Sequence, residues 1–213
     1  LQEMVTQLKN ATADAADWPV MGDRDLSGYE RNRLWLQLPP ERNELRFAEV
    51  AEDTGVTDLY NGRGVSLLDA DNDGDVDVYI ANQGTEGTFY RNLLYGSGRR
   101  GSAHWLGLDL VGDPTPVADR NGRAHASPAD AVSARAVVSC GGKAQRRDVQ
   151  GGTSFAAQSD RRLVFGLGAC AAPESITIYW PSGRVLEIDK DSALAWVDRM
   201  TRVDEKAFAG GAR

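Results

Sequence analysis

Alternating hydrophobic and polar positions run through the chain from residue 46 onward and predict a series of short β-strands. Gly, Pro and Asp residues separate these runs, as expected for turns between strands. The expected strands are residues 47–50, 64–68, 76–80, 88–90, 104–111, 132–140, 144–149, 162–165, 175–180 and 185–188. Many short strands with such turn signals are typical of a sandwich or barrel, so the pattern predicts a mainly β fold.

The two ends of the chain show other patterns. An amphipathic spacing of i, i+3, i+4 and i+7 predicts one short N-terminal helix within residues 1–17, and it is formed by Leu1, Met4, Val5 and Leu8. A short apolar run at 34–36 should end at Pro39 and Pro40, because proline cannot donate to a β-ladder. We expect residues 112–131 to form a long surface loop.

Composition narrows the possible functions. The 213 residues include 24 basic and 31 acidic side chains, which gives a net charge of −7. This acidic balance argues against nucleic-acid binding, which normally needs a basic surface. No long stretch is free of charge, so we expect no membrane span. Residue 1 is Leu and no signal-peptide pattern follows it, so we expect a processed or truncated chain.

The chain has two cysteines, Cys140 and Cys170, both at the ends of expected strands. They are too few for a scaffold held by several disulfides. They could form one bridge or remain as two small buried side chains, and the sequence leaves both alternatives open.

An acidic loop is the most specific feature of the sequence. It contains five carboxylates within residues 69–77, with an apolar strand on each side: Asp69, Asp71, Asp73, Asp75 and Asp77. These charges repel one another unless a cation lies among them, and alternating Asp residues supply the oxygen ligands that Ca²⁺ prefers. We expect Asp75 to contribute its backbone carbonyl and the other four to contribute side chains. Gly74 permits the sharp turn.

Three alternatives fit the loop less well than a calcium site of this kind. An EF-hand needs a Glu at position 12 and flanking helices, whereas position 12 here is Ile80 and the flanks are strands. Mg²⁺ fits less well because it keeps several waters and a strict octahedral geometry. A solvated acidic turn without metal would not explain the spacing together with Gly74. Because one short loop supplies all the ligands, we expect a structural ion rather than a catalytic one.

Residues 62–82, followed by 89–92, resemble an FG-GAP (VCBS-type) repeat, whose members are blades of β-propellers with a calcium-binding loop. Further motifs resemble the ASPIC/UnbV family, whose members include cartilage acidic protein and the UnbV proteins of enediyne gene clusters. These motifs are at residues 26–34, 104–106, 134–138, 141–142, 145–149, 151–155, 158–168 and 180–185. Ser133, where the family usually has Gly, and the long segment 112–131 depart from the pattern. The resemblance implies a propeller-like calcium blade followed by a small β-sandwich.

The resemblance and the strand pattern together predict four parts. They are an N-terminal helix and irregular segment at 1–45, a calcium-binding blade at 46–96, a β-sandwich at 101–190 and a C-terminal tail at 191–213. A propeller needs about four to eight blades, so one repeat cannot close it. We therefore expect this chain to be the C-terminal part of a larger protein, and its N-terminal portion to be a partner.

The family resemblance implies three possible functions. The first is a calcium-stabilised scaffold or binding module linked to enediyne-type biosynthesis, with a polyketide-like small molecule or a protein as its partner. The second is an extracytoplasmic adhesion or matrix-type protein. The localisation of the protein stays open, with an extracytoplasmic one slightly favoured. The third is an enzyme acting on a polyketide-like intermediate. The first and third predict a concave apolar pocket, whereas the second predicts a flat polar face.

The residues themselves offer little support for catalysis. His104 and His125 are the only histidines, and we interpret them as a strand-edge and a loop residue. Ser154 lacks the G-x-S-x-G frame of a nucleophile elbow and the G-K-[ST] ending of a P-loop. We therefore expect no catalytic residue and lean against an enzyme.

Overall fold

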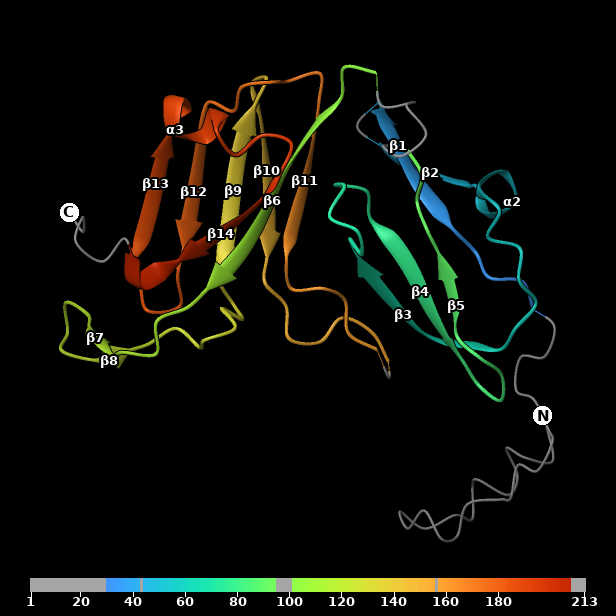
Figure 1. Ribbon diagram of the computed structural model, residues 1–213, viewed down its shortest axis with the longest axis horizontal. Helices are drawn as coiled ribbons and strands as arrows, with labels where there is room; N and C mark the ends of the chain where they lie inside the picture. The colour runs from blue at the N-terminus through green and yellow to red at the C-terminus, as the bar shows by residue number, and fades with distance from the viewer. Residues whose placement is uncertain (1–29, 43, 95–100, 156, 208–213) are drawn as a thin grey trace, which may run out of the picture. The chain divides into compact units, whose positions relative to one another are not determined.

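The computed structural model describes residues 30–42, 44–94, 101–155 and 157–207. The predicted helix within residues 1–17 lies outside these ranges. The described chain is mainly β, which confirms the fold class expected from the alternation (Figure 1). Neither helix in this part of the chain has the length and apolar character needed to span a bilayer.

The described chain divides into two compact units. One contains the residues up to Arg63 together with Ala81–Gly87, and the other contains Gly64–Ile80 and the residues from Thr88 onward. The acidic loop therefore belongs to the same unit as the C-terminal strands, although the sequence suggested a boundary between them near residue 100.

The first unit contains an antiparallel hairpin of β1 (Trp35–Glu41) and β2 (Glu44–Glu49), followed by the short helix α2 (Ala51–Thr54). Strand β1 continues through Pro39 and Pro40, so the expectation that the prolines end the run was wrong. The pairing shifts register between Leu38 and Glu41, which is where the two prolines lie. Proline is tolerated at such an irregularity because no regular ladder bond is lost there.

Strands β3 (Gly62–Leu68), β4 (Asp77–Asn82) and β5 (Thr88–Tyr90) form a three-stranded sheet in that order. The acidic loop connects β3 to β4. The described ranges contain no closed barrel, and this sheet has one strand fewer than a typical propeller blade. Large hydrophobic side chains remain exposed on it, namely Val65, Leu67, Tyr79 and Phe89.

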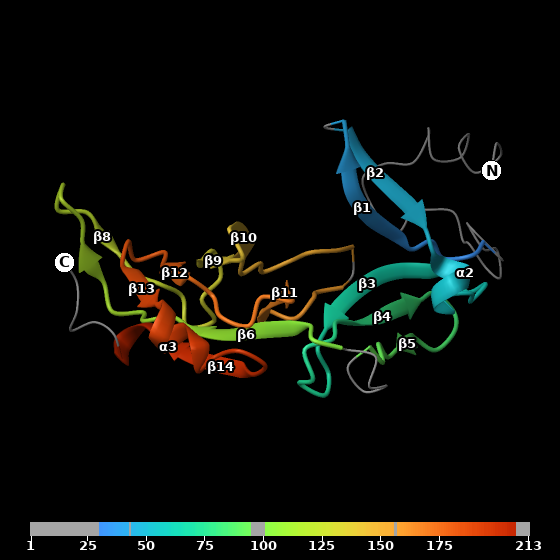
Figure 2. The same cartoon turned by 90° about the horizontal axis from the view of Figure 1, so that it is seen from above.

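The remaining strands form two sheets that share one core. The first sheet has the order β10 (Lys143–Asp148), β9 (Arg135–Cys140), β12 (Ser175–Tyr179) and β13 (Val185–Asp189). The second has the order β11 (Leu163–Gly168), β6 (His104–Val111) and β14 (Met200–Asp204). In Figure 2, β6 and β14 lie on one side and β9 and β10 on the other.

Inward-facing residues of both sheets form the hydrophobic core. Alternate residues are buried along β9 and β12, which matches the period of two that predicted these strands. The largest fully buried hydrophobic side chains in the cluster are Leu106, Leu108, Val138, Phe165, Ile176, Ile178 and Val203. We call this two-sheet body, from His104 to Glu205, the β-domain.

The β-domain extends beyond its expected end at residue 190. Helix α3 (Lys190–Leu194) follows β13, and the Asp189 carboxylate caps it by accepting the Ser192 amide. Strand β14 then pairs in parallel with β6 and buries Val203. Within the expected loop 112–131, the two-residue strands β7 (Val117–Ala118) and β8 (Ala124–His125) form a small hairpin.

A buried polar network fastens the end of β14 to two loops of the β-domain. Glu205, which is 1% exposed, accepts the Asp113 amide at 2.7 Å and the Ser182 hydroxyl. Arg184 donates to Asp113 at 3.0 Å. The backbone amide of Thr115, and then Arg184, lower the pKa of Asp113 to about 2. These contacts give the residues of the 180–185 motif a structural role.

Cys140 and Cys170 form a disulfide, with their Cα atoms 6.0 Å apart. This resolves the alternative that the sequence left open. The bridge joins the end of β9 to the segment after β11, so it crosslinks the two sheets of the β-domain.

Candidate metal centre

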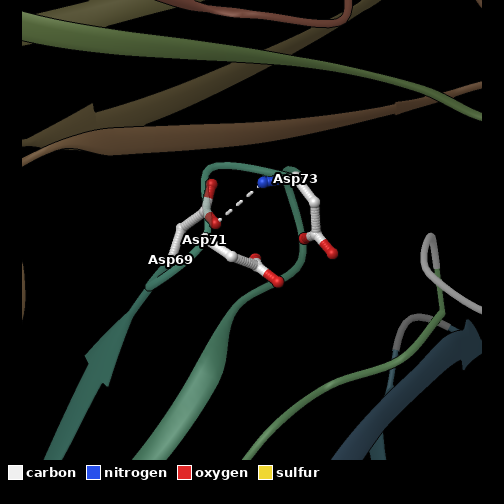
Figure 3. Close-up of side chains that lie close together, drawn as sticks. All are labelled: Asp69, Asp71 and Asp73. Carbon is white, nitrogen blue, oxygen red and sulfur yellow. Dashed lines mark hydrogen bonds between the residues drawn. The ribbon is translucent and has the colours of Figure 1, made fainter.

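The acidic loop brings three of its five carboxylates together. Asp69, Asp71 and Asp73 each offer one oxygen atom, and these oxygens lie within 4.8 Å of one another (Figure 3). The loop reverses direction through two residues with positive φ, Asn72 at 59° and Gly74 at 91°. Asn and Gly are the residues that adopt this conformation most readily, which explains why the sequence forms a tight loop here.

Asp69 organises the loop from inside. It is 2% exposed, and its carboxylate accepts the backbone amides of Asp73 at 3.2 Å and Gly74 at 3.1 Å. Burial raises the pKa of Asp69, while these two amide bonds act in the opposite direction. A buried carboxylate with a raised pKa marks a place where a charge is costly unless a cation accompanies it.

Asp75 and Asp77 do not belong to the three-carboxylate cluster. Both are buried, and the Asp75 amide donates to Asp73 Oδ1 at 2.9 Å. The two oxygens of Asp77 accept the amides of Ala70 at 3.1 Å and Asn92 at 2.8 Å. Asp77 therefore ties the start of the loop to the segment after β5. Metal ligation by Asp75 and Asp77 stays a prediction.

Arg91 lies against the cluster and forms an ion pair with Asp71. This pair is partly exposed, with 54% of the Arg91 side chain and 34% of the Asp71 side chain accessible. Arg91 and Asn92 belong to the stretch 89–92 that resembled the repeat family, but the sequence alone assigned them no role at the loop. Each of them contacts a residue about 15 to 20 positions earlier, so no local sequence pattern indicates these contacts.

The comparison with known families decides which family the β-domain represents. Residues 124–205 match the family model described as ASPIC and UnbV. This region is an ASPIC/UnbV domain. The match covers most of the β-domain, including both cysteines and Ser182, Arg184 and Glu205 of the buried network, whereas Asp113 precedes the matched residues. No curated protein matches the chain in sequence.

The ASPIC/UnbV domain contacts the acidic loop through Arg162, which immediately precedes β11. Its guanidinium donates to the backbone carbonyl of Asp69 at 2.6 Å and to the Asn72 side chain. Asp160 accepts from the same guanidinium at 2.6 Å, and this bond is the main reason that the pKa of Arg162 is raised. The sequence marked residues 158–168 only as a family motif, so this function of Arg162 was missed.

Trp105 of β6 packs against the turn of the loop. It is 3% exposed and points away from the core to which Leu106 and Leu108 belong. Its indole ring lies so close to Gly74 that an added Cβ atom would be 2.2 Å from Trp105 Cδ2. Gly74 is therefore required both by its φ of 91° and by the close approach of this ring.

Both histidines are paired with carboxylates at the edges of the β-domain. His104 Nδ1 lies 2.8 Å from Asp198, whose carboxylate also accepts the Trp105 amide. His125 Nε2 lies 3.3 Å from Asp119. Each pair joins loop or strand-end residues of the β-domain.

Proposed function

We propose that the acidic loop between β3 and β4 binds one calcium ion and that the chain is a calcium-stabilised β module. The observation that carries this proposal is the convergence of Asp69, Asp71 and Asp73. Ca²⁺ binds oxygens at about 2.3–2.6 Å, so two oxygens on opposite sides of the ion lie about 5 Å apart. The 4.8 Å limit on the three carboxylate oxygens fits one such ion.

The residues of the loop would then have different roles at the calcium site. Asp69, Asp71 and Asp73 would hold the ion, whose positive charge offsets their mutual repulsion. Asp77 holds the base of the loop through its two backbone contacts. Arg91 would have to release Asp71, since both the guanidinium and the ion attract the same carboxylate. The ion's role is therefore to clamp β3 and β4.

Titration calorimetry with calcium tests this proposal directly. We expect the chain to bind one equivalent, and Asp73→Ala to abolish or strongly weaken binding because it removes one charged ligand. Asp53→Ala is a matched control, since Asp53 is an exposed residue of α2. Equal calcium binding by both variants would contradict the proposed ligand set. A parallel titration with magnesium tests the preference for calcium.

We further propose that the module is a scaffold or binding component of a larger UnbV-type propeller protein. The three-stranded sheet supports this, because it leaves Tyr79 and Phe89 exposed on one face and Val78 and Tyr90 only partly buried on the other. Tyr79 and Phe89 are cross-strand partners on one face, and the pair Val78 and Tyr90 faces the other way. A propeller blade buries both faces against neighbouring blades. A link to enediyne-type biosynthesis rests on the ASPIC/UnbV domain alone and remains part of the proposal.

We expect the exposed hydrophobic side chains of this sheet to pack against the preceding portion of the protein. Phe89 is 47% exposed, so Phe89→Lys should leave the stability of the isolated chain nearly unchanged. The same substitution should weaken association with the separately expressed N-terminal portion, measured by analytical ultracentrifugation. Unchanged association would argue against packing of blades on this face.

An extracytoplasmic interaction protein is the second candidate, and the disulfide favours it. Disulfides such as Cys140–Cys170 persist mainly in oxidising compartments. A cavity of about 560 Å³ in the second unit has a mixed lining of Leu68, Tyr79 and polar groups. Its composition fits a polar contact surface as well as a small-molecule site. Thiol labelling of the protein from its native source tests this candidate, since labelling of both cysteines before reduction would contradict it.

A further inference from the structure

Arg162 joins its near neighbour Asp160 to two residues of the acidic loop, Asp69 and Asn72, which lie about 90 positions earlier in the sequence. One nitrogen of its guanidinium donates to the Asp69 carbonyl at 2.6 Å, a second donates to the Asn72 side chain, and Nε donates to Asp160 at 2.6 Å. The side chain is only 26% exposed. A planar guanidinium presents its donors in a rigid fork, so these bonds fix the start and the turn of the loop relative to each other.

The segment that carries Arg162 is itself held on the backbone of β3. The Asp160 amide donates to the Leu67 carbonyl at 2.8 Å, and the Ser159 hydroxyl accepts the Leu67 amide at 3.1 Å. Arg162 therefore does not reach the loop as a flexible surface side chain. The segment that carries it is hydrogen-bonded to Leu67, two residues before the first Asp of the loop.

The loop is thus held by two groups of the β-domain. Trp105 packs against Gly74, and Arg162 bonds to the backbone of Asp69 and to Asn72. Asn72 has a φ of 59°, so the guanidinium contacts a residue in the left-handed conformation on which the turn depends. Neither Trp105 nor Arg162 offers an anionic oxygen, so their effect on a bound cation is indirect.

We propose that Arg162 is a positioning residue for the metal centre and that it couples calcium affinity to the ASPIC/UnbV domain. This inference rests on the proposed calcium site. Without Arg162 the like-charged loop should open, and binding would have to reorder it. By linkage, calcium in turn strengthens the contact between loop and domain.

The direction in which calcium affinity changes when Arg162 is replaced distinguishes a positioning role from simple repulsion between two cations. Arg162 is a cation near the site, so its removal would tighten calcium binding if its charge were all that mattered. Asp160 neutralises much of that charge, because it is paired with the same guanidinium. The positioning effect should therefore dominate, and Arg162→Gln should weaken calcium binding about tenfold.

Two other arginines provide controls. Arg161 is paired with Asp130 and is 49% exposed, so Arg161→Gln should change affinity by less than about twofold. Arg91 pairs with a carboxylate of the cluster, so Arg91→Gln should tighten binding by up to about fivefold. Arg162→Lys keeps the charge but loses the fork, and its affinity should fall between those of the unaltered chain and Arg162→Gln.

Calcium calorimetry of the unaltered chain and the four variants provides the test, with far-ultraviolet circular dichroism to confirm folding. Amide hydrogen exchange without calcium adds an independent readout, because the Asp73 and Gly74 amides donate to Asp69. We expect both amides to exchange faster in Arg162→Gln than in Arg161→Gln. Unaltered or tighter calcium binding by Arg162→Gln, or unchanged exchange, would overturn the inference. Absence of binding by the unaltered chain would instead overturn the calcium site itself, and the coupling with it.

Discussion

Substitution of Gly74 by Ala tests how tightly the acidic loop is packed against the β-domain. Gly74 has a φ of 91°, and an added Cβ atom would lie 2.2, 2.4 and 2.5 Å from three atoms of the Trp105 ring. Trp105 is 3% exposed, so its ring cannot swing into solvent to make room. The variant therefore suffers both backbone strain and overpacking.

The contributions of backbone strain and overpacking can be separated by comparing Gly74→Ala with the same substitution at Gly183. Gly183 has a φ of 90°, and an added Cβ atom there would meet nothing within 4 Å. Gly183→Ala should cost about 1 kcal/mol, since left-handed strain of about 1–2 kcal/mol is partly offset by the lower entropy of the unfolded chain. Gly74→Ala adds overpacking of about 1–3 kcal/mol, for a total of about 2–4 kcal/mol.

Urea unfolding of both variants, followed by circular dichroism, measures this difference. We expect the free energy of unfolding to fall by at least about 1 kcal/mol more for Gly74→Ala than for Gly183→Ala. Equal losses for the two variants would refute the close packing of Trp105 on Gly74. They would also remove one of the two contacts through which the β-domain holds the loop.

Three further predictions concern the β-domain. Replacing Cys140 and Cys170 by Ser should lower the free energy of unfolding by about 3.5 kcal/mol in the chain-entropy model, given their separation of 30 residues, and urea unfolding checks this. In the same assay Glu205→Ala should cost about 2–5 kcal/mol, because the buried Asp113 amide and Ser182 hydroxyl lose their acceptor. The depressed pKa of Asp113, about 2, stabilises the fold above the usual Asp pKa of about 3.9. That contribution should disappear as the pH falls from about 4 to about 2, and Asp113→Asn should flatten this part of a stability–pH curve.

Local sequence patterns predicted the parts of the structure that depend on local chemistry. Alternation identified β9 and β12 because each buries one face of a sheet, and the Asp spacing identified the loop in which three carboxylates meet. Strand β14 was missed, since it pairs in parallel with a strand far away in the sequence. The prediction that Pro39 and Pro40 end the strand was wrong, because a register shift accommodates them.

The supporting residues of the site could not be predicted in the same way. Arg162 and Asp69 are separated by 93 positions, and nothing in the sequence around Arg162 shows which carbonyl it will bond. Trp105 has the apolar neighbours of any core residue, but it faces the loop and not the core. Both residues lie in motifs that resembled the ASPIC/UnbV family. Such motifs combine residues that build the domain with residues that contact the loop.

The measurement that tests the calcium site most directly is thermal unfolding of the purified chain in excess calcium and in excess chelator. A ligand that binds only the folded state raises the melting temperature by mass action. We predict a clear rise with calcium that Asp73→Ala abolishes. The same cooperative melting curve for the unaltered chain in calcium and in chelator would contradict a structural calcium ion in this loop.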